Sequence, residues 1–165
     1  MAQVTLKGNP VQTVGDLPAP GQAAPDFTLV DKDLKEISLS DFAGRKIVLN
    51  IFPSVDTPTC ARSVRRFNAE IGKRDDAVAV CVSMDLPFAH ARFCGVEGLD
   101  KVVSASAFRH PEFGKQYGVR ITDGPFAGLF ARAVVVVDEN SRVIYSQLVP
   151  EIGEEPDYEG ALKVL

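Results

Sequence analysis

The sequence has no long apolar run. No stretch of its 165 residues approaches the roughly 20 consecutive apolar residues of a membrane-spanning helix, and residues 1–7 lack the apolar stretch of a signal peptide. Lysines and arginines are scattered along a chain whose formal net charge is -4, which argues against a nucleic-acid surface. We therefore expect a cytoplasmic protein that has neither a membrane nor a nucleic acid among its partners.

Motifs that bind cofactors or metals are also missing. There is no Gly-x-Gly-x-x-Gly or phosphate loop to indicate a nucleotide. The three cysteines, Cys60, Cys81 and Cys94, are 21 and 13 residues apart, so none forms the closely spaced ligand pair of a zinc site. His90 and His110 fall on other predicted elements than Cys60 and near no hydrolase signature, which argues against a cysteine–histidine dyad. We expect neither a metal nor a cofactor.

Cysteine is scarce, and its count and spacing narrow the chemistry. Three cysteines are an odd number for a secreted disulfide scaffold, and in a reducing cytosol they more often have redox or catalytic roles. No Cys-x-x-Cys pair is present, so the chain lacks the motif of a thioredoxin-type disulfide exchanger. Cys81 lies inside the apolar run 77–84, where we expect an inert core residue. Cys94 lies near the end of a helix that we expect to be capped by Asp85 and stopped at Gly95.

The residues that are present predict one α/β domain spanning residues 1–165. Hydrophobic residues make up 45% of the chain, enough for a sizeable core. An N-terminal β-hairpin within residues 1–15, which we expect to be structural, precedes a connector rich in proline and glycine. The further elements are strands at 27–30, 36–39, 47–52, 77–84, 102–106, 131–137 and 142–148, and helices after Pro58 and near 85–95, 111–117 and 157–165. This order fits a thioredoxin-like fold, with a central mixed sheet flanked by helices.

A strand-to-helix junction precedes the first cysteine. The run 47–52 is short, β-branched and nearly all apolar, as in a strand covered on both faces. Pro53 ends this strand because proline has no N–H to donate to a neighbouring strand. Asp56 or Thr57 can cap a helix, and Pro58 fits the first helical position, where the missing N–H costs nothing. A helix is therefore predicted to begin at Pro58.

Cys60 then falls in the first turn of that helix. There the unpaired N–H groups and the positive end of the helix dipole favour thiolate over thiol. Thr57 lies three residues earlier, within reach for its hydroxyl to hydrogen-bond the sulfur or whatever the sulfur attacks. The residues thus favour a reactive cysteine, and the alternative is a plain buried cysteine at a helix start.

The pattern Pro53-x-x-x-Thr57-x-x-Cys60, after a buried strand and the segment Ala24-Pro25-Asp26-Phe27, resembles the active-site signature of the peroxiredoxins. The resemblance covers essentially the whole chain. It is nearest to the bacterial thiol peroxidases, an atypical 2-Cys subfamily, which the segment Arg92-Phe93-Cys94-Gly95 distinguishes. It implies a cysteine peroxidase that reduces hydrogen peroxide and organic hydroperoxides, is re-reduced by thioredoxin and forms a homodimer.

The resemblance also implies a role for each matching residue. Cys60 would be the peroxidatic nucleophile, which becomes a sulfenic acid, and Thr57 would hydrogen-bond the thiolate and the peroxide. Pro53 would shield the pocket, and Arg132 would stabilise the thiolate and the developing negative charge. Cys94 would be the resolving cysteine that closes an intrachain disulfide with Cys60. Without the resemblance, the expected role of Arg132 is an ion pair at a strand end.

Cys60 and Cys94 fall on different predicted helices, which complicates a disulfide between them. Bridging requires Cα atoms within about 7 Å, so we expect local unwinding around residues 57–62 and 86–96 during turnover. Two enzymatic variants stay open, a peroxidase with another reductant and one resolved by an external thiol. A different class is a peroxide sensor or redox-regulated chaperone with slow turnover.

Overall fold

Alternation along the central strands explains how the sequence builds a sheet covered on both faces. In the computed structural model, which describes all 165 residues, Ile47, Leu49 and Ile51 of β5 (Lys46–Ile51) point into one hydrophobic cluster. Val48 points into a second cluster on the opposite face. Because residues 47–51 are all buried and both faces of the strand are covered, β5 is the buried central strand that the sequence predicts.

The main sheet has seven strands and is mixed. Side by side, they are β4 (Glu36–Ser38), β3 (Thr28–Asp31), β7 (Val103–Ser106), β6 (Ala77–Ser83), β5, β8 (Ala133–Val137) and β9 (Val143–Leu148). Strands β5, β6 and β7 run parallel, whereas β8 pairs antiparallel with β5 and β9 antiparallel with β8. This confirms the predicted mixed sheet and thioredoxin-like order of elements.

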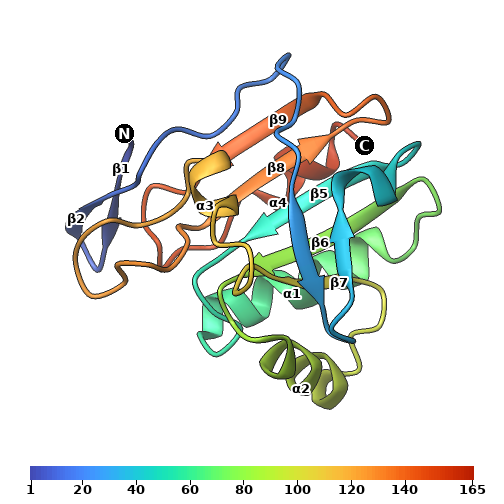
Figure 1. Cartoon of the computed structure of the whole chain (residues 1–165), viewed down its shortest axis with the longest axis horizontal. Helices are drawn as coiled ribbons and strands as arrows, with labels where there is room; N and C mark the ends of the chain where they lie inside the picture. Colours follow the sequence, from blue (N-terminus) through green and yellow to red (C-terminus); the bar gives the residue numbers. More distant parts are fainter.

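A separate two-stranded sheet is formed by β1 (Gln3–Leu6) and β2 (Asn9–Gln12), which confirms the predicted hairpin. Figure 1 shows this hairpin standing apart from the main sheet. It is joined to the segment after β9, since Thr5 N donates to Pro150 O over 2.7 Å and Ile152 N donates to Thr5 O over 2.8 Å. The first residues of the chain therefore lie beside residues close to its end.

Helices cover both faces of the main sheet (Figure 1). The face that carries Val48 is covered by α1 (Pro58–Ile71), α2 (Pro87–Glu97) and α4 (Tyr158–Leu162). The other face is covered by the 3-10 helix η1 (Leu39–Phe42) and by α3 (Phe113–Gln116). Helices α3 and α4 are shorter than the sequence predicts. None of the helices combines the length and apolar character needed to cross a membrane.

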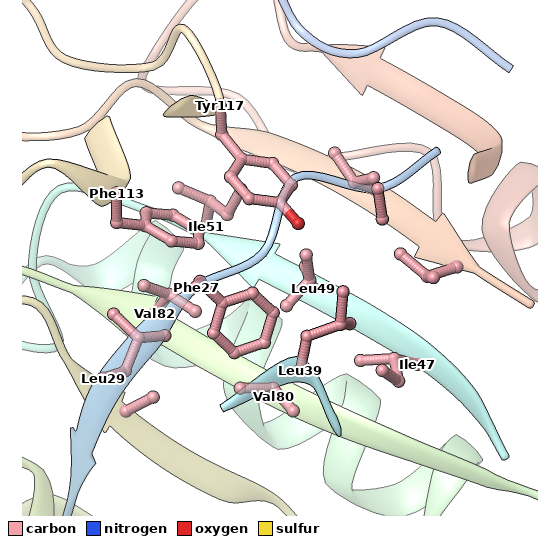
Figure 2. Close-up of a cluster of buried hydrophobic side chains, with 14 of the residues drawn as sticks. Phe27, Leu29, Leu39, Ile47, Leu49, Ile51, Val80, Val82, Phe113 and Tyr117 are labelled. Carbon is pink, nitrogen blue, oxygen red and sulfur yellow. The ribbon is translucent and has the colours of Figure 1, made fainter. Parts of the chain in front are cut away.

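The larger cluster of buried side chains lies on the α3 face (Figure 2). Its aromatic residues come from distant parts of the chain: Phe113 and Tyr117 stack with ring centroids 4.6 Å apart, and Phe27 meets Phe113 edge to face at 5.9 Å. Phe27 belongs to the segment that precedes β3. The cluster therefore fixes that segment and α3 against β5 and β6, and leaves the opposite face to the cysteine-bearing helices.

Helix α2 begins and ends at other residues than the sequence predicts. Asp85 does not cap it, because the N-cap position is Leu86 and the Asp85 carboxylate instead accepts a hydrogen bond from Val55 N over 2.9 Å. Gly95 does not stop it either: the helix continues to Glu97, and Gly98 caps its C-terminus with a φ of 68°, in the left-handed region that favours glycine. Asp85 was an acceptable cap by local sequence, but its carboxylate is used by the loop around Val55, which is distant in the chain.

Candidate active site

Cys60 is placed by the junction between β5 and α1. The strand ends at Ile51, and α1 begins at Pro58 with Thr57 at its N-cap position, so Cys60 lies in the first turn as predicted. Its side chain is fully buried. Unpaired N–H groups and the positive end of the helix dipole are found at a helix start, which is where this sulfur lies. Burial keeps water away from it, which strengthens every electrostatic interaction that the sulfur makes.

Arg132 contacts Cys60 from the residue that precedes β8. It directly precedes β8, which pairs with β5, and its Nη2 donates to Cys60 Sγ over 3.2 Å. Its Nε donates to Ile152 O over 2.8 Å, whereas its Nη1 is buried without a hydrogen-bond partner. The side chain is only 1% exposed and takes part in no ion pair. A buried cation without a carboxylate partner stabilises negative charge on the sulfur beside it.

A pocket of about 350 Å³ opens onto this arginine. Arg132, Pro53 and Thr57 line it, and Pro53 is buried in its wall. The remaining lining residues are Leu6, Lys7, Pro58, Thr59, Phe126, Ile152 and Gly153. Two of them, Leu6 and Lys7, come from the N-terminal hairpin. The hairpin, for which we expect a structural role, thus also contributes to the wall of this pocket.

Thr57 does not make the contact that its position suggests. Its Oγ1 donates to Ser54 O over 3.1 Å, and no hydrogen bond joins it to Cys60. A hydroxyl has one hydrogen to give, and here that hydrogen is used within the loop that connects β5 to α1. The lone pairs of the oxygen remain available to accept a hydrogen bond in the pocket, so the predicted role of Thr57 toward a peroxide stays a prediction.

Asp85 supports the loop that carries Pro53 and Thr57. Besides the bond from Val55 N, its carboxylate accepts hydrogen bonds from Ser54 Oγ at 2.8 Å and from Ser83 Oγ at 2.6 Å. Sequence reasoning missed this role. A signal was present, because Asp85 follows β6 just as Ser54 follows β5, and the carboxyl ends of adjacent parallel strands lie at one edge of a sheet.

His90 extends this network into α2. It is 1% exposed, and its Nε2 lies 3.0 Å from Ser83 Oγ. Since Ser83 gives its only hydrogen to Asp85, Nε2 must be the donor, and burial lowers the pKa of His90 so that it favours the neutral form. His110 instead pairs with Glu36. No hydrogen bond joins either histidine to Cys60.

Cys94 lies outside the pocket. It is 7% exposed on α2, and its Sγ is 3.2 Å from Ser104 Oγ. All three cysteines are free, and they share one buried cluster that lies between α1, α2 and β6. Burial raises the pKa of Cys81 to about 12, as expected for an inert core thiol. The structure thus joins Cys60 with Arg132 and leaves Cys94 on a neighbouring helix.

Comparison with known proteins identifies the family. Residues 19–162 match the Redoxin family. Thiol peroxidases from Mycobacterium bovis and Mycobacterium tuberculosis are each 57% identical to the chain over 165 residues, which is 100% of this chain and 99% of theirs.

Solved structures agree with this result. A peroxiredoxin-like protein from Aquifex aeolicus has a TM-score of 0.94 at 40% identity, covering 99% of this chain and 95% of its own. A thiol peroxidase from Chromobacterium violaceum has a TM-score of 0.88 at 26% identity, covering 98% of this chain and 94% of its own. The length of the match, the sequence identity and the fold indicate the same family. The chain belongs to the redoxin family as a peroxiredoxin enzyme of the thiol peroxidase type.

Proposed function

We propose that Cys60 is the nucleophile of a hydroperoxide reductase that acts on hydrogen peroxide and organic hydroperoxides. The observation that supports this most strongly is the 3.2 Å contact between Arg132 Nη2 and Cys60 Sγ beside an open pocket. Helix start and guanidinium both place positive charge at one buried sulfur, as a thiolate nucleophile requires.

In the first step, the Cys60 thiolate attacks the terminal oxygen of the peroxide. An S–O bond forms while the O–O bond breaks, so Cys60 is oxidised to a sulfenic acid and the remaining alkoxide takes up a proton to leave as an alcohol or water. Arg132 Nη1 has no partner in the protein. It is available to donate to the peroxide oxygens, on which negative charge grows in the transition state.

Pro53 and Thr57 prepare the pocket for this step. Pro53 is buried where the pocket wall meets the end of β5, and it keeps water from the sulfur without offering a competing N–H donor. Thr57 Oγ1 accepts a hydrogen bond from the peroxide, or turns from Ser54 O to donate to it. Both residues help to position the peroxide, and the electrons come from Cys60.

In the second step, Cys94 attacks the sulfur of the Cys60 sulfenic acid. An S–S bond forms, and the hydroxyl leaves as water after it takes up a proton. Both cysteines are buried on separate helices, so this step requires unwinding of the first turn of α1 and of α2. Thioredoxin then supplies two electrons through its dithiol and restores both thiols.

A coupled assay tests the proposal. Peroxide-dependent oxidation of NADPH in the presence of thioredoxin and thioredoxin reductase is expected for the wild type and lost in Cys60→Ser. Cys94→Ser is expected to block cycling but to allow one oxidation of Cys60, whereas the matched control Cys81→Ser is expected to cycle normally. A single fast oxidation without turnover in the wild type would instead favour a peroxide sensor or redox-regulated chaperone.

We also propose that the protein is a homodimer, as its family resemblance implies. Leu86 and Phe88, at the start of α2, are 50% and 66% exposed, and such apolar side chains are common in contacts between subunits. Sedimentation equilibrium is expected to give twice the mass of one chain. A single-chain mass at micromolar concentration would contradict the proposal.

A further inference from the structure

Glu151 connects the N-terminal hairpin to the segment after β9. Its carboxylate accepts four hydrogen bonds: Oε1 from Thr5 Oγ1 at 2.9 Å and Gly8 N at 2.8 Å, Oε2 from Lys7 N at 3.2 Å and Gly153 N at 2.9 Å. Together they lower the pKa of Glu151 to about 2. The carboxylate therefore stays charged at neutral pH and holds two segments from opposite ends of the chain together.

The hairpin turn is shaped around this carboxylate. Lys7 and Gly8 both have positive φ, 52° and 81°, and their consecutive N–H groups face the same anion. Successive N–H groups in this conformation form a concave anion-binding site. A lysine is uncommon in the left-handed region, so the bonds to Glu151 help to offset the strain at Lys7.

The residues that follow Glu151 support the candidate active site. Ile152 O is the acceptor for Arg132 Nε at 2.8 Å, and Gly153 O accepts from Thr59 Oγ1 in the first turn of α1 at 2.9 Å. The turn held by Glu151 supplies Leu6 and Lys7 to the pocket wall. Two sides of the pocket thus depend on one side chain that is not among its lining residues.

We propose that Glu151 is a positioning residue for the peroxidase reaction. It acts through the backbone: it holds Ile152 O where Arg132 needs it to face Cys60, and it holds the hairpin against the pocket. This inference rests on the proposed function of Cys60, and it goes further by making peroxide selectivity depend on a carboxylate in the segment after β9.

Glu151→Gln is the sharpest variant, because the shape is kept while one oxygen becomes an NH₂ group that faces N–H or O–H donors. In single-turnover oxidation of Cys60, we expect the rate constant to fall about threefold with hydrogen peroxide and about tenfold with cumene hydroperoxide. The bulky peroxide is expected to lose more because it also needs the hairpin wall. Thr5→Val, which removes a single bond to Glu151, is expected to lie between wild type and Glu151→Gln.

Asp138→Asn is the matched control. Asp138 Oδ1 also accepts two backbone N–H bonds in a turn, from Asn140 at 2.9 Å and Arg142 at 3.0 Å, but it lies at the opposite end of β8 from Arg132. We expect Asp138→Asn to lower thermal stability without changing the ratio of the two peroxide rate constants. If Glu151 only anchored the N-terminal hairpin, Glu151→Gln would likewise lower thermal stability and leave the ratio of the two peroxide rate constants unchanged.

Alkylation of Cys60 by iodoacetamide, followed on the Cys60 peptide by mass spectrometry, measures the thiolate without peroxide. We expect Glu151→Gln to slow alkylation at neutral pH and Asp138→Asn to leave it unchanged. If Glu151→Gln kept both the alkylation rate and the peroxide ratio of the wild type, the inference would be wrong. If neither hydrogen peroxide nor cumene hydroperoxide oxidised the wild type, the proposed function would fail. The alkylation rates would still decide the role of Glu151.

Discussion

Arg132 Nη2 lies 3.2 Å from Cys60 Sγ, although 72 residues separate the two in the sequence. The guanidinium forms no ion pair, and the carbonyl of Ile152 fixes its Nε. Its positive charge is thus directed at the sulfur and the pocket. This pair links the start of α1 to the residue before β8, and most of the expected chemistry depends on it.

Arg132→Lys is expected to lower the rate constant for oxidation of Cys60 by about 100-fold, because a single ammonium group cannot contact Cys60, Ile152 O and a peroxide at once. Stopped-flow measurement of the first oxidation checks this. Arg142→Lys, at an exposed arginine bonded to Gly21 O, is the control and is expected to react like the wild type. Equal rate constants for Arg132→Lys and the wild type would show that the guanidinium of Arg132 is not needed for the oxidation of Cys60.

Peroxide treatment is expected to produce a disulfide between Cys60 and Cys94, and to lower hydrogen-exchange protection in residues 57–62 and 86–96. The reason is that both cysteines are buried on separate helices in the dithiol form. Peptide mapping and exchange on reduced and oxidised protein measure both effects, with Cys81→Ser as the control. A disulfide that includes Cys81, or identical protection in the two forms, would contradict this mechanism.

Asp85→Asn is expected to lower the free energy of unfolding by about 2 kcal/mol, since the amide cannot accept from all three donors that the carboxylate serves. It is also expected to slow Cys60 oxidation, because the loop with Pro53 and Thr57 loses its support. Urea unfolding and stopped-flow kinetics test the two effects. Loss of stability with an unchanged oxidation rate would show that the loop is positioned by other contacts.

The free energy of unfolding is expected to fall as the pH drops below 6.5, the ordinary pKa of a histidine side chain. Burial lowers the pKa of His90 in the folded state, although Asp85 opposes this shift, so the unfolded chain binds the proton more readily. Urea unfolding at about pH 7.5 and about pH 5.5 measures the effect. His90→Gln is expected to lose less stability between the two pH values, and an equal loss in both proteins would exclude His90 as the source.

Several features followed from local sequence. The apolar run before Pro53 and the proline at position 58 predicted a buried strand followed by a helix with Cys60 in its first turn, and the structure has this arrangement. These predictions succeeded because strand burial, proline geometry and helix starts depend on residues within one or two turns of chain. The start of α2 was misjudged because a backbone N–H that is distant in the sequence, that of Val55, donates to the Asp85 carboxylate.

The sequence by itself determined which cysteine sits at a helix start, the order of strands and helices, and the family that the chain resembles. The resemblance already implied that Arg132 acts on Cys60, and the tertiary structure adds the 3.2 Å contact between them. Only the tertiary structure decided that Leu6 and Lys7 form a pocket wall and that Glu151 accepts hydrogen bonds from the turn of that hairpin. These relationships join residues far apart in the chain. Side chains at that separation meet through strand pairing and packing, which no short sequence pattern specifies.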